Sequence, residues 1–290
     1  MTYSMKDRLF AYAQLMRLDK PVGTLLLLWP TLAALWIAAE GVPPLPILLA
    51  FVVGTFMMRS AGCVINDIAD RNFDGRVART HDRPLPEGRI SLVEAFALFG
   101  VLLVLALAIV MTLNTATQLL AAAGVLITIT YPFLKRWTHW PQVVLGAAFS
   151  WGIPMAFTAV TGSLPLIAWV LFAASAVWIV AYDTEYAMVD RRFDLEIGLK
   201  SSAILFANLD RGIIGVLQSL ALILFCVAGV QAGFRHAFFA ALVAAAGLFV
   251  YHQWLIRERE ESACFKAFRN NVWVGFALFA GAAIEYQALA

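Results

Sequence analysis

Long stretches without a charged residue alternate with short charged segments along the whole chain. A helix needs about 20 apolar residues to cross the hydrocarbon core of a bilayer. The second stretch is interrupted only by Arg59 and then continues to Asn66. The pattern therefore predicts membrane-spanning helices rather than buried helices of a soluble protein. The uncharged stretches are 21–39, 41–58, 95–134, 137–182, 212–234, 236–256 and 270–284.

Two of these stretches are too long for one span. Polar breaks at 112–117 and 161–165 divide them into two helices each. The last stretch is the shortest and ends before Glu285. We expect an all-α integral membrane protein with nine transmembrane helices, formed by residues 1–290 as a single polytopic domain.

Basic residues are confined to one set of connections. Nine spans place the N-terminal segment and the connections 66–94, 135–140, 183–211 and 257–269 on one side. All Lys and Arg except Arg235 fall on that side, if Arg59 is assigned to its nearest helix end. Because Lys and Arg are retained in the cytoplasm, we expect a cytoplasmic N-terminus and an external C-terminus.

Composition supports a membrane protein and excludes several functions. The hydrophobic fraction is 62%, against roughly 45–50% in globular proteins. A net charge of +2 argues against a nucleic-acid partner. The three cysteines are too few and too scattered for a disulfide framework or a zinc site.

An acidic motif closes the second predicted helix. At 100° per residue its polar members share an arc of about 100°, and Arg59 lies on the same face two turns deeper. These members are Asn66, Asp67, Asp70 and Asp74.

A second acidic motif closes the sixth predicted helix. Its three aspartates fall within about 40°, and Glu185 points away from them. The segment 190–194 repeats the pattern of 70–74, which suggests two parallel halves with opposed acidic faces. The three aspartates are Asp183, Asp190 and Asp194.

Carboxylates on two facing stripes need a cation between them, since like charges repel. Oxygen ligands without His or Cys favour Mg²⁺, which completes its shell with water and substrate phosphates. The motifs therefore indicate a diphosphate, and a membrane-edge site suits a polyprenyl diphosphate. Its carbocation would need aromatic faces, for which Tyr131, Tyr182 and Tyr186 are candidates. Interleaved basic residues that could neutralise the diphosphate are Arg71, Arg76, Arg79, Arg83, Arg191 and Arg192.

At these motifs the chain resembles the UbiA-type superfamily of intramembrane aromatic prenyltransferases. The resemblance implies nine transmembrane helices in a ring around a central, lipid-open cavity, capped by cytoplasmic loops. Further stretches are similar to the members that transfer a polyprenyl group to 4-hydroxybenzoate in ubiquinone synthesis. These stretches are 17–23, 79–86, 131–136, 152–157 and 200–204.

The resemblance also implies that Arg59, Tyr131 and Lys135 line the active site. Lys135 ends a predicted helix, where a lysine is otherwise an interfacial anchor. Arg59 lies inside an apolar run, where an unpaired guanidinium is costly. Two roles stay open for Arg59: pairing with Asp67 or Asp70, or binding the carboxylate of an aromatic acid.

Ala187 departs from superfamily members that carry an aspartate at this position, which leaves open which second-motif aspartates contact metal. His139, His236 and His252 show no partner pattern and are interpreted as interfacial.

We therefore expect an Mg²⁺-dependent enzyme of the bacterial inner membrane, with its active site facing the cytoplasm. It would transfer a polyprenyl group to the carbon ortho to the hydroxyl of 4-hydroxybenzoate, by electrophilic aromatic substitution. No side chain stands out as the base for the ring proton. The alternatives are another acceptor, such as dihydroxynaphthoate, homogentisate or haem, and a transporter of a divalent cation or organic anion. Transporter sites lie near the bilayer midplane, whereas these aspartates lie at helix ends.

Overall fold

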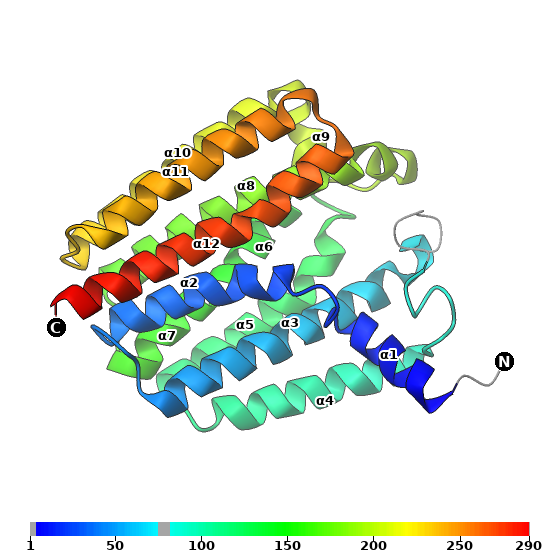
Figure 1. Cartoon of the computed structure of the whole chain (residues 1–290). Coiled ribbons are helices and arrows are strands. Elements are labelled where there is room, and N and C mark those ends of the chain that lie inside the picture. The colour runs from blue at the N-terminus through cyan, green and yellow to red at the C-terminus, as the bar shows by residue number, and fades with distance from the viewer. Residues whose placement is uncertain (1–3, 75–81, 290) are drawn as a thin grey trace.

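The computed structural model describes residues 4–74 and 82–289, with side chains described for 4–71 and 82–288. Every regular element within these residues is a helix, which confirms the all-α expectation (Figure 1). The helices that form the bundle are α2 (Val22–Ala38), α3 (Leu45–Asp74), α4 (Leu92–Val110), α5 (Thr115–Leu134), α6 (Pro141–Ser150), α7 (Gly152–Thr161), α8 (Leu166–Ile197), α10 (Asp210–Gln231), α11 (Ala237–Leu255) and α12 (Glu261–Leu289). The remaining elements are α1 (Met5–Leu15), α9 (Ser202–Phe206), and the 3-10 turns η1 (Ala207–Leu209) and η2 (Ile256–Glu258).

Seven helical segments of the described chain are long and apolar enough to cross a membrane. The set omits α12 and also α2, which has only 17 residues. The count of nine spans therefore stays a prediction. The seven segments are Leu45–Arg71, Leu92–Val110, Thr115–Leu134, Pro141–Thr161, Leu166–Ile197, Ser202–Gln231 and Ala237–Glu258.

The polar breaks fall within a few residues of their predicted positions. The side chain of Asn114 caps α5 by accepting a hydrogen bond from the backbone N–H of Thr117. Gly162 ends α7 in the left-handed conformation, with φ of 70°. Pro165 then precedes the first residue of α8.

The span expected to end near residue 161 is divided into α6 and α7 at Trp151. Pro154 has no backbone N–H, so the carbonyl of Ser150 loses its helical partner. Gly152 lies so close to α2 that a Cβ atom there would be 2.6 Å from Oγ1 of Thr31. The break thus lets α7 pack tightly on α2.

The core lies where α8 packs against α6, α10 and α12. Trp178 and Ile179 of α8 are completely buried there. The last long helix, α12, packs against the first, α2. The two motif-bearing helices α3 and α8 are thereby held in one bundle.

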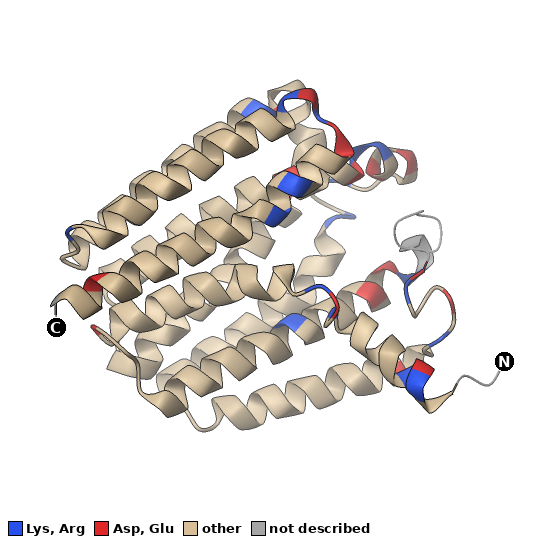
Figure 2. Ribbon diagram, in the orientation of Figure 1, with Lys and Arg blue, Asp and Glu red and all other residues tan. Residues whose placement is uncertain are grey.

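Charged residues gather at one end of this bundle, as Figure 2 shows. That end carries α1 and the connections after α3, α5, α8 and α11, as far as they are described (Figure 1). The connections 39–44, 111–114, 162–165 and 232–236 lie at the opposite end (Figure 1). The polar segments therefore separate into the two predicted groups.

Candidate active site

Both acidic motifs line one cavity of about 180 Å³ at the charged end of the bundle. Helix α3 contributes Asn66 and Asp70, and the end of α5 contributes Tyr131 and Lys135. Arg83 and Tyr186 also line it. The sequence prediction that the two motifs face each other matches this geometry. The aspartates from α8 are Asp183, Asp190 and Asp194.

Helix continuity explains this arrangement. Helix α3 runs through Asp74 and α8 runs to Ile197, so residues spaced by four and seven positions stay on one stripe. Gly198 ends α8 with φ of 74°. The backbone N–H of Lys200 then donates to the carbonyl of Lys135 at 2.9 Å, which joins the chain after α8 to the end of α5.

One carboxylate oxygen of Asp70 is hydrogen-bonded, and the other is not. Lys135 Nζ and Asn66 Nδ2 both donate to Oδ2 of Asp70, the latter at 3.2 Å. The other oxygen, Oδ1, is buried and has no hydrogen-bond partner within the described residues. A buried carboxylate oxygen without a partner is costly, so this atom is suited to bind a cation.

Asp67 is not part of the cavity lining. Arg17 Nη2 donates to both of its carboxylate oxygens, at 2.8 and 2.9 Å. Arg83 Nη1 donates to Oδ1 at 3.1 Å, and the Asp67 side chain is 1% exposed. Its ion pairs therefore join α3 to the segment after α1 and to the segment before α4. Arg17 was not among the predicted site residues, although it lies in a stretch that carried the family resemblance.

Arg59 belongs to α3, and its side chain lies beside α2 and α6. Its guanidinium is 5.6 Å from the ring centroid of Phe149. It packs so closely on Gly23 that a Cβ atom there would be 2.4 Å from Nη2. Its charge also acts on Asp183 of α8. Within the described residues, Asp67 and Asp70 accept hydrogen bonds from side chains other than Arg59.

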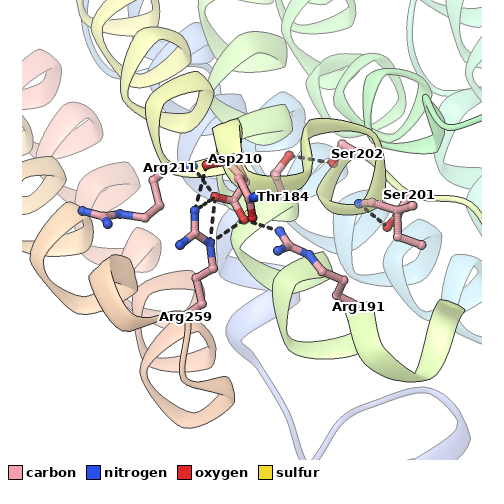
Figure 3. Close-up of polar contacts among 9 residues, drawn as sticks. Thr184, Arg191, Ser201, Ser202, Asp210, Arg211 and Arg259 are labelled. Atoms are coloured by element: carbon pink, nitrogen blue, oxygen red, sulfur yellow. Dashed lines mark hydrogen bonds and ion pairs between the residues drawn. The ribbon is translucent and has the colours of Figure 1, made fainter.

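Arg191 points away from the cavity and binds Asp210 at the start of α10 (Figure 3). Asp210 is fully buried and also accepts hydrogen bonds from Arg259, with Nη2 at 2.8 Å from Oδ1. The backbone N–H of Arg211 donates to the same oxygen at 2.7 Å. Sequence reasoning missed Asp210, which belongs to neither motif.

Four further residues predicted for the site are not among the described residues that line the cavity. Arg71 is exposed, and its Nη1 donates to the carbonyl of Ile68 at 3.0 Å. Arg76, Arg79 and the side chain of Asp74 lie outside the described part of the chain, so their roles stay predictions.

The sequence profile of the UbiA prenyltransferase family matches residues 27–279. The chain belongs to the UbiA prenyltransferase family. It is 56% identical over 281 residues to a 4-hydroxybenzoate octaprenyltransferase of Aeromonas hydrophila, covering 97% of this chain and 98% of that protein. A UbiA homologue of Aeropyrum pernix, solved without ligand, has a TM-score of 0.81 and 25% identity, covering 90% and 97% of the two chains.

A UbiA homologue of Archaeoglobus fulgidus, solved with GPP and Mg²⁺, has a TM-score of 0.72 and covers 93% and 99% of the two chains. At 18% identity this likeness concerns the fold.

The described acidic side chains do not by themselves form a complete metal site. In the described residues, no group of three or more His, Cys, Asp or Glu side chains is close enough to hold an ion alone. Mg²⁺ usually takes only a few carboxylates from protein and fills its shell with water and phosphate oxygens. Oδ1 of Asp70 and the aspartates of α8 fit this pattern.

A second polar cluster lies on the face of α8 that packs against α10, α11 and α12. The fully buried Glu185 accepts hydrogen bonds from Gln218 Nε2 at 3.1 Å and Asn271 Nδ2 at 3.0 Å. Asn271 Oδ1 in turn accepts from Trp178 Nε1 at 2.8 Å. The helical wheel placed Glu185 away from the aspartates but gave no partners for it.

The interfacial interpretation of His252 is wrong. Its side chain is completely buried. Its Nε2 lies 2.9 Å from Oδ1 of Asn270, and its Nδ1 lies 3.8 Å from Glu185. This face of α11 packs against α12, which carries the polar partner that sequence spacing did not reveal.

Proposed function

We propose that this UbiA family member transfers a polyprenyl group from a polyprenyl diphosphate to 4-hydroxybenzoate, in ubiquinone biosynthesis. The observation that carries the proposal is the joint lining of one cavity by both acidic motifs. The 56% identity to a 4-hydroxybenzoate octaprenyltransferase over almost the whole length of both chains supports the choice of acceptor. The bond formed joins the allylic carbon to the ring carbon ortho to the hydroxyl.

Asp70 and Asn66 on α3 face the aspartates of α8 and would hold Mg²⁺ together with the diphosphate. Asp74 is proposed to join them. When bound, Mg²⁺ withdraws charge from the leaving diphosphate and favours cleavage of the allylic C–O bond. Asp67 orders Arg17 and Arg83 through its ion pairs. The aspartates concerned on α8 are Asp183, Asp190 and Asp194.

Cationic side chains at the cavity receive the leaving group. Arg83 and Lys135 line it and donate to diphosphate oxygens as the C–O electron pair departs with the diphosphate. Tyr131 and Tyr186 present aromatic rings to the allylic cation. The ring carbon then supplies the electrons of the new C–C bond, and the ring proton passes to the released diphosphate.

Arg59 binds the acceptor in this proposal. Its guanidinium lies beside Phe149 and Gly23, and its charge acts on Asp183 across the bundle. A guanidinium holds a carboxylate through two parallel hydrogen bonds. This contact would fix the ring of 4-hydroxybenzoate in one orientation.

The membrane arrangement is part of the same proposal. Helices α2 and α12 supply the two spans beyond the seven already identified, and their mutual packing closes the bundle into a ring around the cavity. The charged end faces the cytoplasm of a bacterial inner membrane, with the N-terminus inside.

Impermeant thiol labelling tests this topology. Single cysteines replace Arg192, whose side chain is 88% exposed at the charged end, and Val42, which is 71% exposed at the other end. The background lacks Cys63, Cys226 and Cys264. In intact cells the cysteine at position 42 should react and that at position 192 should be protected. Reaction at both positions would contradict the proposed orientation.

The function is tested with membranes containing the protein, Mg²⁺ and radiolabelled 4-hydroxybenzoate. A series of polyprenyl diphosphates is the donor set, and dihydroxynaphthoate and homogentisate are competing acceptors. Prenylated 4-hydroxybenzoate should form, and EDTA should abolish it until Mg²⁺ is restored. Preferential prenylation of another acceptor, or no transfer with any donor, would overturn the proposal.

A further inference from the structure

A wide groove of about 900 Å³ runs along the outside of α10, away from the active-site cavity. Its floor follows one face of α10 at helical spacing, from Gly212 and Gly215 to Ser219 and Ile223. A Cβ atom at position 212 would meet nothing within 4 Å. Small side chains from Gly212 to Ser219 therefore hollow this face over about 10 Å of helix, at 1.5 Å per residue.

The groove lies on a membrane-crossing segment. The span Ser202–Gln231 contains its whole floor. Val216 and Ile223, which also line the groove, are 67% and 59% exposed, so this face of α10 meets the bilayer. A hydrocarbon chain suits the apolar part of such a groove.

The charged end of the groove carries an excess of positive charge. Arg211 and Arg259 line it. Asp210 accepts hydrogen bonds from the guanidinium groups of Arg259 and Arg191 (Figure 3). Only the backbone N–H of Arg211 donates to it, so the Arg211 guanidinium is not paired with this carboxylate.

Arg211 is only partly engaged. Its Nη1 donates to the carbonyl of Arg257 at 3.0 Å, and its buried Nε has no hydrogen-bond partner among the described residues. Glu258 pairs with Arg257 at 3.4 Å. The Arg211 guanidinium is therefore the group best suited to accept an anion at the groove head.

We propose that this groove binds an anionic phospholipid of the leaflet at the charged end of the bundle. The phosphate binds Arg211 with support from Arg259, and an acyl chain lies along Gly212, Gly215 and Ser219. Basic pockets between transmembrane helices on the cytoplasmic side commonly hold anionic lipid headgroups. The proposal does not depend on which acceptor the active site uses.

Native mass spectrometry of the detergent-purified chain tests the site with phosphatidylglycerol and, separately, phosphatidylcholine. Wild-type protein should retain phosphatidylglycerol at a defined one-to-one ratio and phosphatidylcholine at least about fivefold more weakly, a difference near 1 kcal/mol. Arg211→Gln should remove this preference. Gly215→Leu, which fills the floor, should reduce retention of both lipids.

Matched controls come from the same chain. Arg192→Gln removes an equally basic but highly exposed side chain at the same end. Gly247→Leu adds the same bulk on α11, where a Cβ atom meets nothing within 4 Å. Both controls should bind as wild type. Equal retention of the two lipids by wild type, or equal losses in test and control variants, would overturn the proposal. Dimers that persist after lipid removal and are lost in Gly215→Leu would assign the groove to a second copy instead.

Discussion

The acidic motifs on α3 and α8 are near copies in sequence but have different electrostatic surroundings. On α3, Asp67 and Asp70 are bound by cations from three other segments, through Arg17, Arg83 and Lys135. On α8, the motif's own Arg191 turns outward to Asp210. A repeated sequence pattern therefore supplies two carboxylate stripes but does not give them equivalent roles.

This difference suggests that the two motifs have different roles, one mainly in anchoring neighbouring segments and the other mainly in lining the cavity. The α3 motif is anchored by ion pairs that also order the neighbouring segments, with one buried oxygen of Asp70 left for a ligand. The α8 motif presents three aspartates to the cavity and is anchored from outside through Arg191. Four sets of substitutions test the distinction.

Loss of one cavity carboxylate on either helix should have the largest effect. Asp70→Ala and Asp190→Ala should each lower turnover more than a hundredfold, a loss above about 2.7 kcal/mol, because each removes a ligand shared with the diphosphate. Initial rates in membranes, normalised to the amount of inserted protein, give the measurement. Glu196→Ala, at an exposed site on the same helix end, is the control. If both test variants keep more than a tenth of wild-type activity, the metal-site assignment is wrong.

Asp67→Ala should instead act on stability. It leaves Arg17 and Arg83 without their carboxylate, and breaking a buried ion pair costs about 3–5 kcal/mol. Thermal unfolding in detergent should therefore shift clearly downward. Asp183→Ala, a cavity variant, should unfold close to the wild-type temperature while losing turnover. The reverse order of the two melting temperatures would remove the distinction between anchoring and cavity carboxylates.

Arg59→Ala should separate the two substrates. A hydrogen-bonded charged group contributes about 1.5–3 kcal/mol, so the KM for 4-hydroxybenzoate should rise roughly 10- to 100-fold. The KM for the polyprenyl diphosphate should change much less, and 4-hydroxybenzamide should be a poor substrate of the wild type. Steady-state kinetics with each substrate varied in turn provide the comparison. A larger change for the diphosphate, or in Mg²⁺ dependence, would assign Arg59 to the leaving group.

The smallest effect is expected for Arg191→Gln. Because Arg191 binds Asp210 rather than lining the cavity, the KM for the diphosphate should stay within about threefold, less than roughly 0.7 kcal/mol. Arg83→Gln, which alters the cavity wall, should raise the same KM by about tenfold. Matching effects in the two variants would mean that Arg191 reaches the substrate during turnover.

Much of this arrangement could be predicted from sequence because it depends on local spacing. Helical periodicity placed the aspartates on stripes, and the family resemblance selected Tyr131 and Lys135, which the structure brings to the same cavity. Helix ends near residues 114 and 162 followed from polar and glycine residues whose effect is also local.

Partners from distant segments could not be predicted in this way. A helical wheel gives the direction of Asp67 or Glu185 but not the helix that it meets. The pairing of Arg17 with Asp67, and of Arg191 with Asp210, spans intervening elements whose packing no local pattern specifies. The same reasoning explains why His252 was interpreted as interfacial.

The buried contacts of Asn271 have a consequence for the register of α8. Apolar helix faces can slide or rotate against one another at little cost, whereas a buried polar residue can restrict an interface to one alignment. Asn271 binds Trp178 and Glu185, which are two helical turns apart on α8, so one amide fixes both the axial position and the rotation of that helix. By fixing α8, this amide also sets the direction in which the aspartates on the opposite face of the helix point into the cavity. Redesign of the cavity wall for another acceptor can vary many side chains, but α12 must keep this amide.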